Sequence, residues 1–214
     1  FVNKTIRTKS KTYTTAQYCS RIAGIIAGTP MTISCTYAPL PEVIGCDVWT
    51  KEEMDTMAGA GKLFFFFDGE KVKLARGINS LVTTVQDKGT SFQKIKLVDL
   101  MDMMHDDIRT TAQDHYLGKY ANSYANRCLL VTAIQGYLDQ LAQEGLLEQD
   151  QNTAYIDVES TKIWLESNGK YTKAELADMS DMDIKLANIG SNVFIAVKAS
   201  LLDAMEDVTI TINI

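Results

Sequence analysis

The chain has two histidines, and these are the first residues to consider for catalysis or metal binding. His105 and His115 lie on one predicted helix, about 15 Å apart along its axis, which is too far for them to share a metal ion. The carboxylates around His105 offer an acidic metal site or a general base, and they are Asp99, Asp102, Asp106 and Asp107. A solvated helix face explains the same residues, and we favour that interpretation.

No motif of a known reaction accompanies these residues. The sequence contains no nucleophile elbow, zinc-protease motif, P-loop or dinucleotide-binding glycine pattern. We therefore expect no enzymatic activity, no metal and no cofactor.

The four cysteines do not form a ligand set for a metal. Cys19, Cys35, Cys46 and Cys128 are separated by 16, 11 and 82 positions, and no histidine stands at metal-ligand spacing from them. We expect four buried, reduced thiols.

Charge argues against general nucleic-acid binding. The 214 residues carry 21 basic and 27 acidic side chains, a net charge of −6, whereas duplex binding depends on Lys and Arg. Residues 1–41 contain five basic side chains and no acidic one. The rest of the chain therefore has 16 basic and 27 acidic side chains, a net charge of −11. This basic segment is a contact strip or a solvated strand and turn.

The longest apolar run, residues 63–67, is far shorter than the roughly 20 residues that span a bilayer, and no secretory signal opens the chain. We therefore expect no contact of this chain with a membrane. Because the first residue is Phe1 and not Met, we interpret the chain as part of a longer protein.

Periodicity and turn residues predict an α+β fold with mixed sheets and packed helices. The three prolines lie within residues 30–41 and predict a loop, and capping boxes predict helix starts after Thr14 and Thr50. Strands are predicted at 1–7, 63–67, 71–76, 155–158, 193–198 and 208–214. Helices are predicted at 95–116, 123–144, 160–168 and, weakly, 172–188. The two long helices are expected to bury apolar stripes, the first at Ile95, Val98, Met101, Met104, Ile108, Ala112 and Tyr116.

The last seven residues alternate strictly between apolar and polar side chains. Val208, Ile210, Ile212 and Ile214 fall on one face of the predicted strand, and Thr209, Thr211 and Asn213 on the other. Such a strand pairs with a sheet of its own domain or adds to a sheet of another subunit. The sequence alone leaves both possibilities open, and residues 203–207 are a candidate linker before the strand.

Three stretches resemble one protein family over essentially the whole chain. They are DGEK with ARGINSL in residues 68–81, the run LVDLMDMMHDDIRTTAQDHYLGKYANSYANRCLLVTAIQGYLDQLAQEGLL at 97–147, and SNVFIAVKASLLDAMEDVTITINI at 191–214. The chain resembles the tail sheath subunit of contractile phage tails, of the type found in Gram-positive defective prophages and phage-tail-like bacteriocins.

This resemblance implies a structural subunit that polymerises around an inner tube and contracts to drive the tube through a cell envelope. It implies that residues 1–88 end the middle domain of a sheath protein. Residues 89–214 then form its C-terminal domain, whose last strand, 208–214, is exchanged between subunits. The alternative is a monomeric α+β binding or adapter module, with this strand folded onto its own sheet.

The implied partners are other copies of the chain, the inner tail tube protein, the baseplate and the tail terminator. Assembly is expected in the cytoplasm of a host bacterium, within a phage tail or a phage-tail-like particle. Candidate charges facing the tube are Lys94, Lys96, Asp99, Asp102, Asp106 and Asp107.

Overall fold

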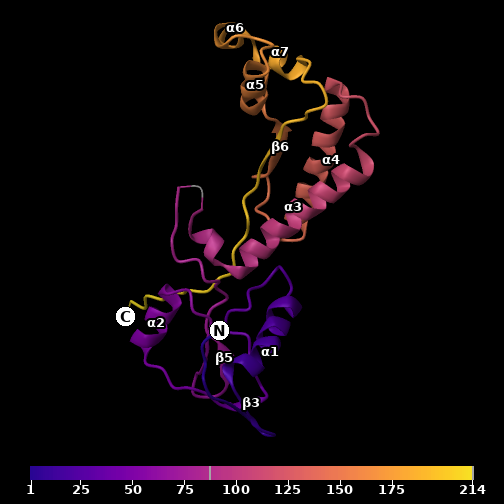
Figure 1. Cartoon of the computed structure of the whole chain (residues 1–214). Helices are drawn as coiled ribbons and strands as arrows, with labels where there is room; N and C mark the ends of the chain where they lie inside the picture. Colours follow the sequence, from indigo (N-terminus) through magenta and orange to yellow (C-terminus); the bar gives the residue numbers. More distant parts are fainter. Residues whose placement is uncertain (87, 214) are drawn as a thin grey trace. The chain divides into compact units, whose positions relative to one another are not determined.

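The computed structural model describes residues 1–86 and 88–213, and it confirms the α+β class. The chain forms two compact units (Figure 1). The first unit contains Phe1–Asp102 together with the segment that begins at Asp203, and the second contains Met103–Leu202. The first unit is therefore built from two parts of the sequence.

The first unit combines small antiparallel sheets with helices. Strands β1 (Ile6–Thr8), β2 (Thr12–Tyr13) and β3 (Val43–Gly45) pair in the order β2-β1-β3. Strands β4 (Phe65–Phe67) and β5 (Val72–Leu74) form the hairpin that Asp68 and Gly69 predict. Helices α1 (Thr15–Gly28) and α2 (Lys51–Gly59), a 3₁₀ turn (Thr90–Gln93) and the start of α3 (Ile95–His115) complete the unit.

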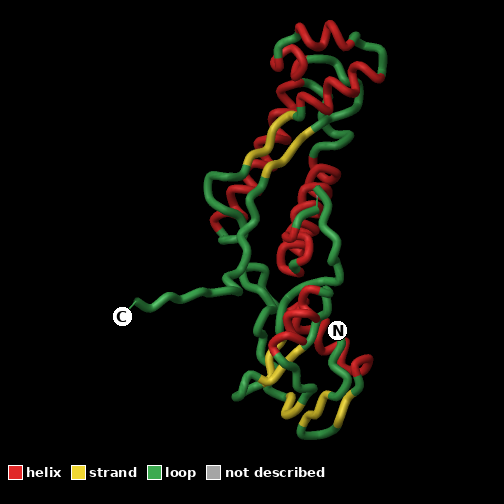
Figure 2. The backbone as a smooth tube through the Cα atoms, turned by 90° about the vertical axis from the view of Figure 1, so that its left-hand side faces the viewer, coloured by secondary structure: helices red, strands yellow, loops and turns green. Residues whose placement is uncertain are grey.

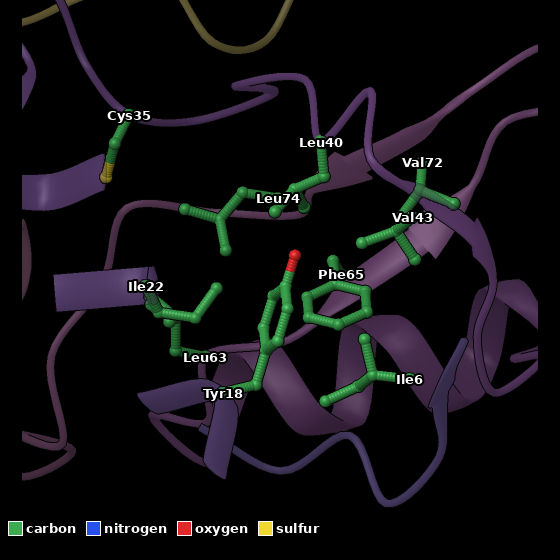
Figure 3. Packing of buried hydrophobic residues seen from close by; sticks show 10 residues of the cluster. All are labelled: Ile6, Tyr18, Ile22, Cys35, Leu40, Val43, Leu63, Phe65, Val72 and Leu74. Atoms are coloured by element: carbon green, nitrogen blue, oxygen red, sulfur yellow. The ribbon is translucent and has the colours of Figure 1, made fainter. Parts of the chain in front are cut away.

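Aromatic and branched side chains from these elements form one core. Tyr18 of α1 packs edge-on against Phe65 of β4, with ring centroids 5.9 Å apart. Figure 3 shows both rings among the other core residues, Ile6, Ile22, Cys35, Leu40, Val43, Leu63, Val72 and Leu74. Each fully buried side chain of this kind stabilises the fold by about 1.5–3 kcal/mol.

The second unit consists of the rest of α3, helix α4 (Tyr124–Gln143), a two-stranded sheet and three short helices. Strands β6 (Thr153–Ile156) and β7 (Ile195–Lys198) pair antiparallel, with Tyr155 opposite Ala196. Helices α5 (Val158–Ser167), α6 (Lys173–Asp178) and α7 (Asp181–Leu186) connect the two strands. They enclose a separate small core at Leu165, Leu176, Ile184, Ala187 and Ile189.

Helix starts were the most predictable feature. Both predicted capping boxes are present, Thr14 with Gln17 and Thr50 with Glu53, and further boxes begin α6 and α7. The strands at 1–7 and 155–158 are displaced, because pairing places β1 at Ile6–Thr8 and β6 at Thr153–Ile156. Among the described residues, no helix is both long and apolar enough to cross a membrane.

The predicted apolar stripe of α3 is confirmed at Met104, and Ile95 packs against the core, but the most buried side chains at the start of the helix are others. Leu97 and Leu100 are buried there, at 4% and 0% exposure, and Met104 continues the same face at 7%. Ile95, Val98 and Met101, which the prediction placed inward, are only partly buried. The two stripes share the same spacing, so periodicity alone did not select between them.

The side chain of Asn3 forms the hydrogen bonds with β4 that the backbone of a neighbouring strand would otherwise form. Its side-chain Nδ2 donates to the carbonyl oxygen of Phe65, and its Oδ1 accepts from the amide of Phe65, each at 2.9 Å. Asn3 is fully buried. One side-chain amide therefore satisfies both backbone groups of a core residue.

We predict that Asn3→Leu destabilises the first unit. The substitution leaves two buried backbone groups of Phe65 unpaired, so the free energy of unfolding is expected to fall by about 2–4 kcal/mol. Urea denaturation followed by circular dichroism measures the change. Lys4→Leu, at an exposed neighbouring position, is the control and is expected to have little effect; an equal loss in both variants would contradict the prediction.

Candidate functional site: the C-terminal arm and its base

Residues 208–213, called the arm below, belong to no helix or strand of the described chain. Val208, Ile210 and Ile212 are 75%, 77% and 79% exposed. Figure 2 shows the arm as a loop that extends away from the strands and helices of the first unit. Ile214 lies outside the described residues. Three large apolar side chains on one face thus remain in water.

Residues 203–207, called the arm base, are attached to the first unit through Glu206. Its Oε1 lies 2.8 Å from the hydroxyl of Ser34 and 2.6 Å from the hydroxyl of Thr36. Its side chain is only 7% exposed. A carboxylate this buried requires partners, because removing its charge from water costs several kcal/mol.

Two cations supply the rest of the partners. Arg76 Nη1 and Lys94 Nζ lie 3.5 Å and 3.2 Å from Oε2 of Glu206. Arg76 also pairs with Asp207, and Lys94 with Asp203. Three acidic residues of the arm base therefore converge on two cations of the preceding sequence.

The receiving loop is shaped by a glycine. The amide of Gly77 donates to Oγ1 of Thr36 at 2.8 Å, which fixes the hydroxyl that binds Glu206. A Cβ atom on Gly77 would lie only 2.8 Å from Sγ of Cys35 and 3.0 Å from Oγ of Ser34. Only glycine allows this close approach of the two segments.

The electrostatics favour a charged Glu206. Burial raises its pKa, but hydrogen bonds from Thr36, Ser34 and Lys94 outweigh this effect and hold the pKa below the ordinary value. The neighbouring Arg76 likewise lowers the pKa of Asp207. At neutral pH the cluster is thus ionised and attractive.

The arm base is not the free linker that the sequence suggested. The contact of Glu206 was not predictable, because its hydroxyl partners Ser34 and Thr36 lie 172 and 170 positions away in the sequence. No local pattern predicts a contact at that distance. The three acidic residues within 203–207 were the one feature of the sequence that indicated an interaction with cations.

The candidate tube-facing charges have different environments. Lys94 is engaged with the arm base, and Lys96 is buried at 8% exposure, which lowers its pKa. Asp106 pairs with Arg109, and Asp107 accepts a hydrogen bond from the hydroxyl of Tyr137 at 2.7 Å. Asp99 and Asp102 are exposed on α3. The assignment of these six residues to a tube contact stays a prediction.

The residues considered for chemistry lie on an exposed part of α3. The side chain of His105 is 74% exposed, with Nδ1 at 3.4 Å from Asp106. Within residues 1–86 and 88–213, no group of three His, Cys, Asp or Glu side chains is placed to hold a metal ion. The cysteines are all free, but the expectation that all are buried is wrong, since Cys19 is exposed.

Comparison with known proteins defines the class to which this fold and arm belong. The profile of the phage tail sheath C-terminal domain matches residues 87–214. The chain belongs to this family of phage tail sheath proteins.

Similar proteins agree with this assignment. The tail sheath protein of Clostridium phage phiCD119 is 42% identical over 200 residues, which cover 94% of this chain and 55% of the relative. The chain thus spans about half the length of that protein. The sheath tail protein of Desulfitobacterium hafniense has a similar fold, with a TM-score of 0.64 and 22% identity over 73% of this chain and 38% of that one. A sheath complex of an extracellular contractile injection system in its contracted state has a TM-score of 0.62 and 13% identity, over 90% and 49% of the two chains.

We predict that Glu206→Gln releases the arm base. The variant keeps the side-chain shape but removes the charge that Arg76 and Lys94 neutralise, at an expected cost of about 1.5–3 kcal/mol. Heteronuclear ¹⁵N NOE values of residues 203–207 are expected to fall to those of the arm. Met205→Gln, at a position that is 97% exposed, is the matched control and should leave these values unchanged.

Acidification of the unchanged chain should have the same effect. Because the native pKa of Glu206 is lowered, its stabilising contribution is complete above the ordinary value of 4.5 and is lost as pH falls through the native value. NOE values recorded between about pH 6 and pH 3 follow this loss. Order that persists in Glu206→Gln would show that the cluster does not hold the arm base.

Proposed function

We propose that this chain is part of a contractile tail sheath subunit that polymerises around an inner tube and contracts to drive the tube through a target cell envelope. The observation that carries this proposal is the exposed apolar arm of a chain in the sheath family. A segment with three apolar side chains in water is an incomplete structure, and pairing as a strand with another subunit completes it.

The arm supplies the binding energy of this pairing in two ways. Its backbone amides and carbonyls form main-chain hydrogen bonds with the edge of a sheet, and its alternating side chains set the register. Burial of Val208, Ile210 and Ile212 contributes about 1.5–3 kcal/mol for each side chain. The arm base keeps the starting point of the arm fixed on its own subunit.

The β6–β7 sheet offers an acceptor edge. On β6, the amide of Ala154 points away from β7, because it donates to Oε1 of Gln135 at 2.9 Å. On β7, the alternation of the ladder turns the backbone groups of Ile195 and Val197 outward. Helix α4 packs against β6, whereas the outer edge of β7 is paired with no other strand of the described chain, so a third strand can be added there.

The remaining assignments complete the proposal. Residues 1–88 form the end of the middle domain and residues 89–214 the C-terminal domain, with arm exchange between copies. The inner tube, the baseplate and the tail terminator are the other partners, and the particle is assembled in the host cytoplasm. The work of contraction is stored in the assembled sheath, so the chain has no enzymatic role.

We predict that Ile210→Lys prevents assembly whereas Thr211→Lys does not. Both variants add one charge to the arm, but only residue 210 lies on the apolar face, where pairing would bury an unpaired ammonium group. Negative-stain electron microscopy of the complete gene product, expressed with and without its tube partner, is the measurement. Hollow cylinders are expected for the unchanged protein and for Thr211→Lys.

Dispersed particles for the unchanged protein under both conditions would contradict the sheath proposal. That result would favour a monomeric binding or adapter module of the same fold. Equal assembly of both lysine variants would instead show that the arm is not the element that joins the subunits.

We predict further that Val197→Pro blocks acceptance of the arm. Proline removes one outward-facing amide of β7 but does not remove a hydrogen bond between β6 and β7. Because the arm then loses a main-chain donor, cylinders are expected to be short or absent. Val197→Thr keeps the amide and should assemble. Thermal unfolding of the free chain checks that the second unit stays folded. Normal cylinders from folded Val197→Pro would place the acceptor elsewhere.

A further inference from the structure

The second unit contains a cavity of 440 Å³ at the beginning of α4. Residues of the segment between α3 and α4, the first turns of α4 and the loop before β7 line this cavity. Its walls are mainly apolar and aromatic, with contributions from Tyr116, Leu117, Tyr120 and Val193. Gly118, with a φ of 74°, allows the tight turn that brings Leu117 and Tyr120 to the same opening.

A buried cation that forms no ion pair among the described residues lines the cavity. Arg127 is only 4% exposed, and its Nη2 donates to the carbonyl oxygen of Ala187 at 3.3 Å. Its Nε and Nη1 have no hydrogen-bond partner among the described residues. Burial lowers the pKa of Arg127, but a guanidinium stays protonated at neutral pH.

This arrangement is unfavourable in the free chain. A buried cation that lacks a counter-charge loses its hydration without compensation, and proteins normally pair such groups. Guanidinium nitrogens match the two oxygens of a carboxylate in geometry and charge. The missing partner of Arg127 is therefore an anion, of which a carboxylate fits best.

An orphan acceptor lines the same cavity. The Nδ2 group of Asn122 donates to the carbonyl oxygens of Gly190 and Asn192, each at 2.7 Å, which holds the loop before β7. Its Oδ1 is buried and has no partner among the described residues. A ligand that satisfies both Arg127 and Asn122 offers a carboxylate together with an N–H donor, as an acidic residue of a polypeptide does.

The rim points to a macromolecular partner. Leu117 and Tyr120 are 52% and 54% exposed at the opening, and the rings of Tyr116 and Tyr120 lie 5.7 Å apart. Tyrosines around a buried arginine are typical of the energetic centre of a protein interface. A small carboxylate ion would leave this apolar rim in water, whereas a protein segment would cover it.

We infer that the Arg127 cavity receives an Asp or Glu side chain of a second copy of this chain, as a contact between subunits that is separate from the arm. The inference rests on the proposed assembly of the chain. Charge supports a second copy as the source, because the chain carries 27 acidic residues against 21 basic ones.

The first test measures carboxylate recognition in the free chain. The probe is N-acetyl-L-glutamic acid α-methylamide, which carries one carboxylate and two amide N–H groups, and its glutamine analogue is the neutral control. Saturable shifts of the Arg127 Nε–H signal in ¹H–¹⁵N spectra are expected for the glutamate probe only. Arg127→Met, which lacks this signal, is followed by the backbone amide signals of Leu117 and Tyr120 at the cavity, and it should bind about tenfold or more weakly. Arg109→Met, at an exposed arginine paired with Asp106, should leave binding unchanged.

Thermal unfolding separates this role from a structural one. If Arg127 is kept for a partner, Arg127→Met removes an unpaired buried charge, and the midpoint of unfolding should stay equal or rise. A lower midpoint would show that Arg127 supports the fold and would overturn the inference. Tyr120→Ala, at the exposed rim, is a second variant that tests the contact without altering the buried groups.

The second test measures assembly of the complete gene product by electron microscopy. Folded Arg127→Met and Tyr120→Ala are expected to form few or no cylinders, whereas Arg109→Met assembles. Normal assembly of Arg127→Met would overturn the inference, even if the glutamate probe binds, since the cavity would then serve a free carboxylate. The inference would also be overturned if the glutamate and glutamine probes bind equally well, or if neither binds. Failure of the unchanged protein to assemble would refute the proposed function, and the titration alone would then decide whether the cavity recognises a carboxylate.

Discussion

Glu206 lies where two hydroxyl groups and two cations converge, and the position of everything that follows it depends on this contact. A carboxylate pulled out of water is costly unless several donors replace its hydration, and here four groups do so. The residues on either side, Asp203 and Asp207, use the same two cations. A short acidic segment is therefore ordered by charge, while the apolar segment after it is left exposed. Under the proposed exchange of arms, this division would let the arm reach a partner without losing its attachment point.

An exposed apolar segment that alternates like a strand is also a hazard, because it can pair with any open sheet edge. Several features limit wrong pairing in this chain. The arm is short, its polar face carries Thr209, Thr211 and Asn213, and an acidic segment precedes it. The net charge of −6 keeps free chains apart at low ionic strength, so specific contacts must overcome a general repulsion. On β6, the amide of Ala154 already donates to the side chain of Gln135. The edge of β6 is therefore a poorer acceptor for another strand than the edge of β7.

Local chemistry determined which parts of the fold were predictable. The pairs Thr14–Gln17 and Thr50–Glu53 act within one helical turn, so their sequence pattern was sufficient. Gly69 and Asp68 similarly marked the β4–β5 hairpin. The buried face of α3 at Leu97 and Leu100 depended on what the helix packs against, and the spacing of apolar residues did not reveal it. Glu206 and Arg127 were missed for the same reason. Glu206 binds partners more than a hundred positions away in the sequence. Arg127 is notable because its Nε and Nη1 have no hydrogen-bond partner among the described residues, which a sequence does not reveal.

The two-part composition of the first unit has a consequence for biosynthesis. Arg76 and Lys94 leave the ribosome long before Asp203, Glu206 and Asp207, with the whole of Met103–Leu202 between them. The loop at Ser34 and Thr36 therefore waits for a carboxylate that is translated 172 and 170 residues later, respectively. A ribosome that stalls or terminates early thus yields a chain in which the arm and its attachment are missing together. Under the proposed exchange of arms, such a product has no arm to donate, so it would not extend a growing polymer by this route.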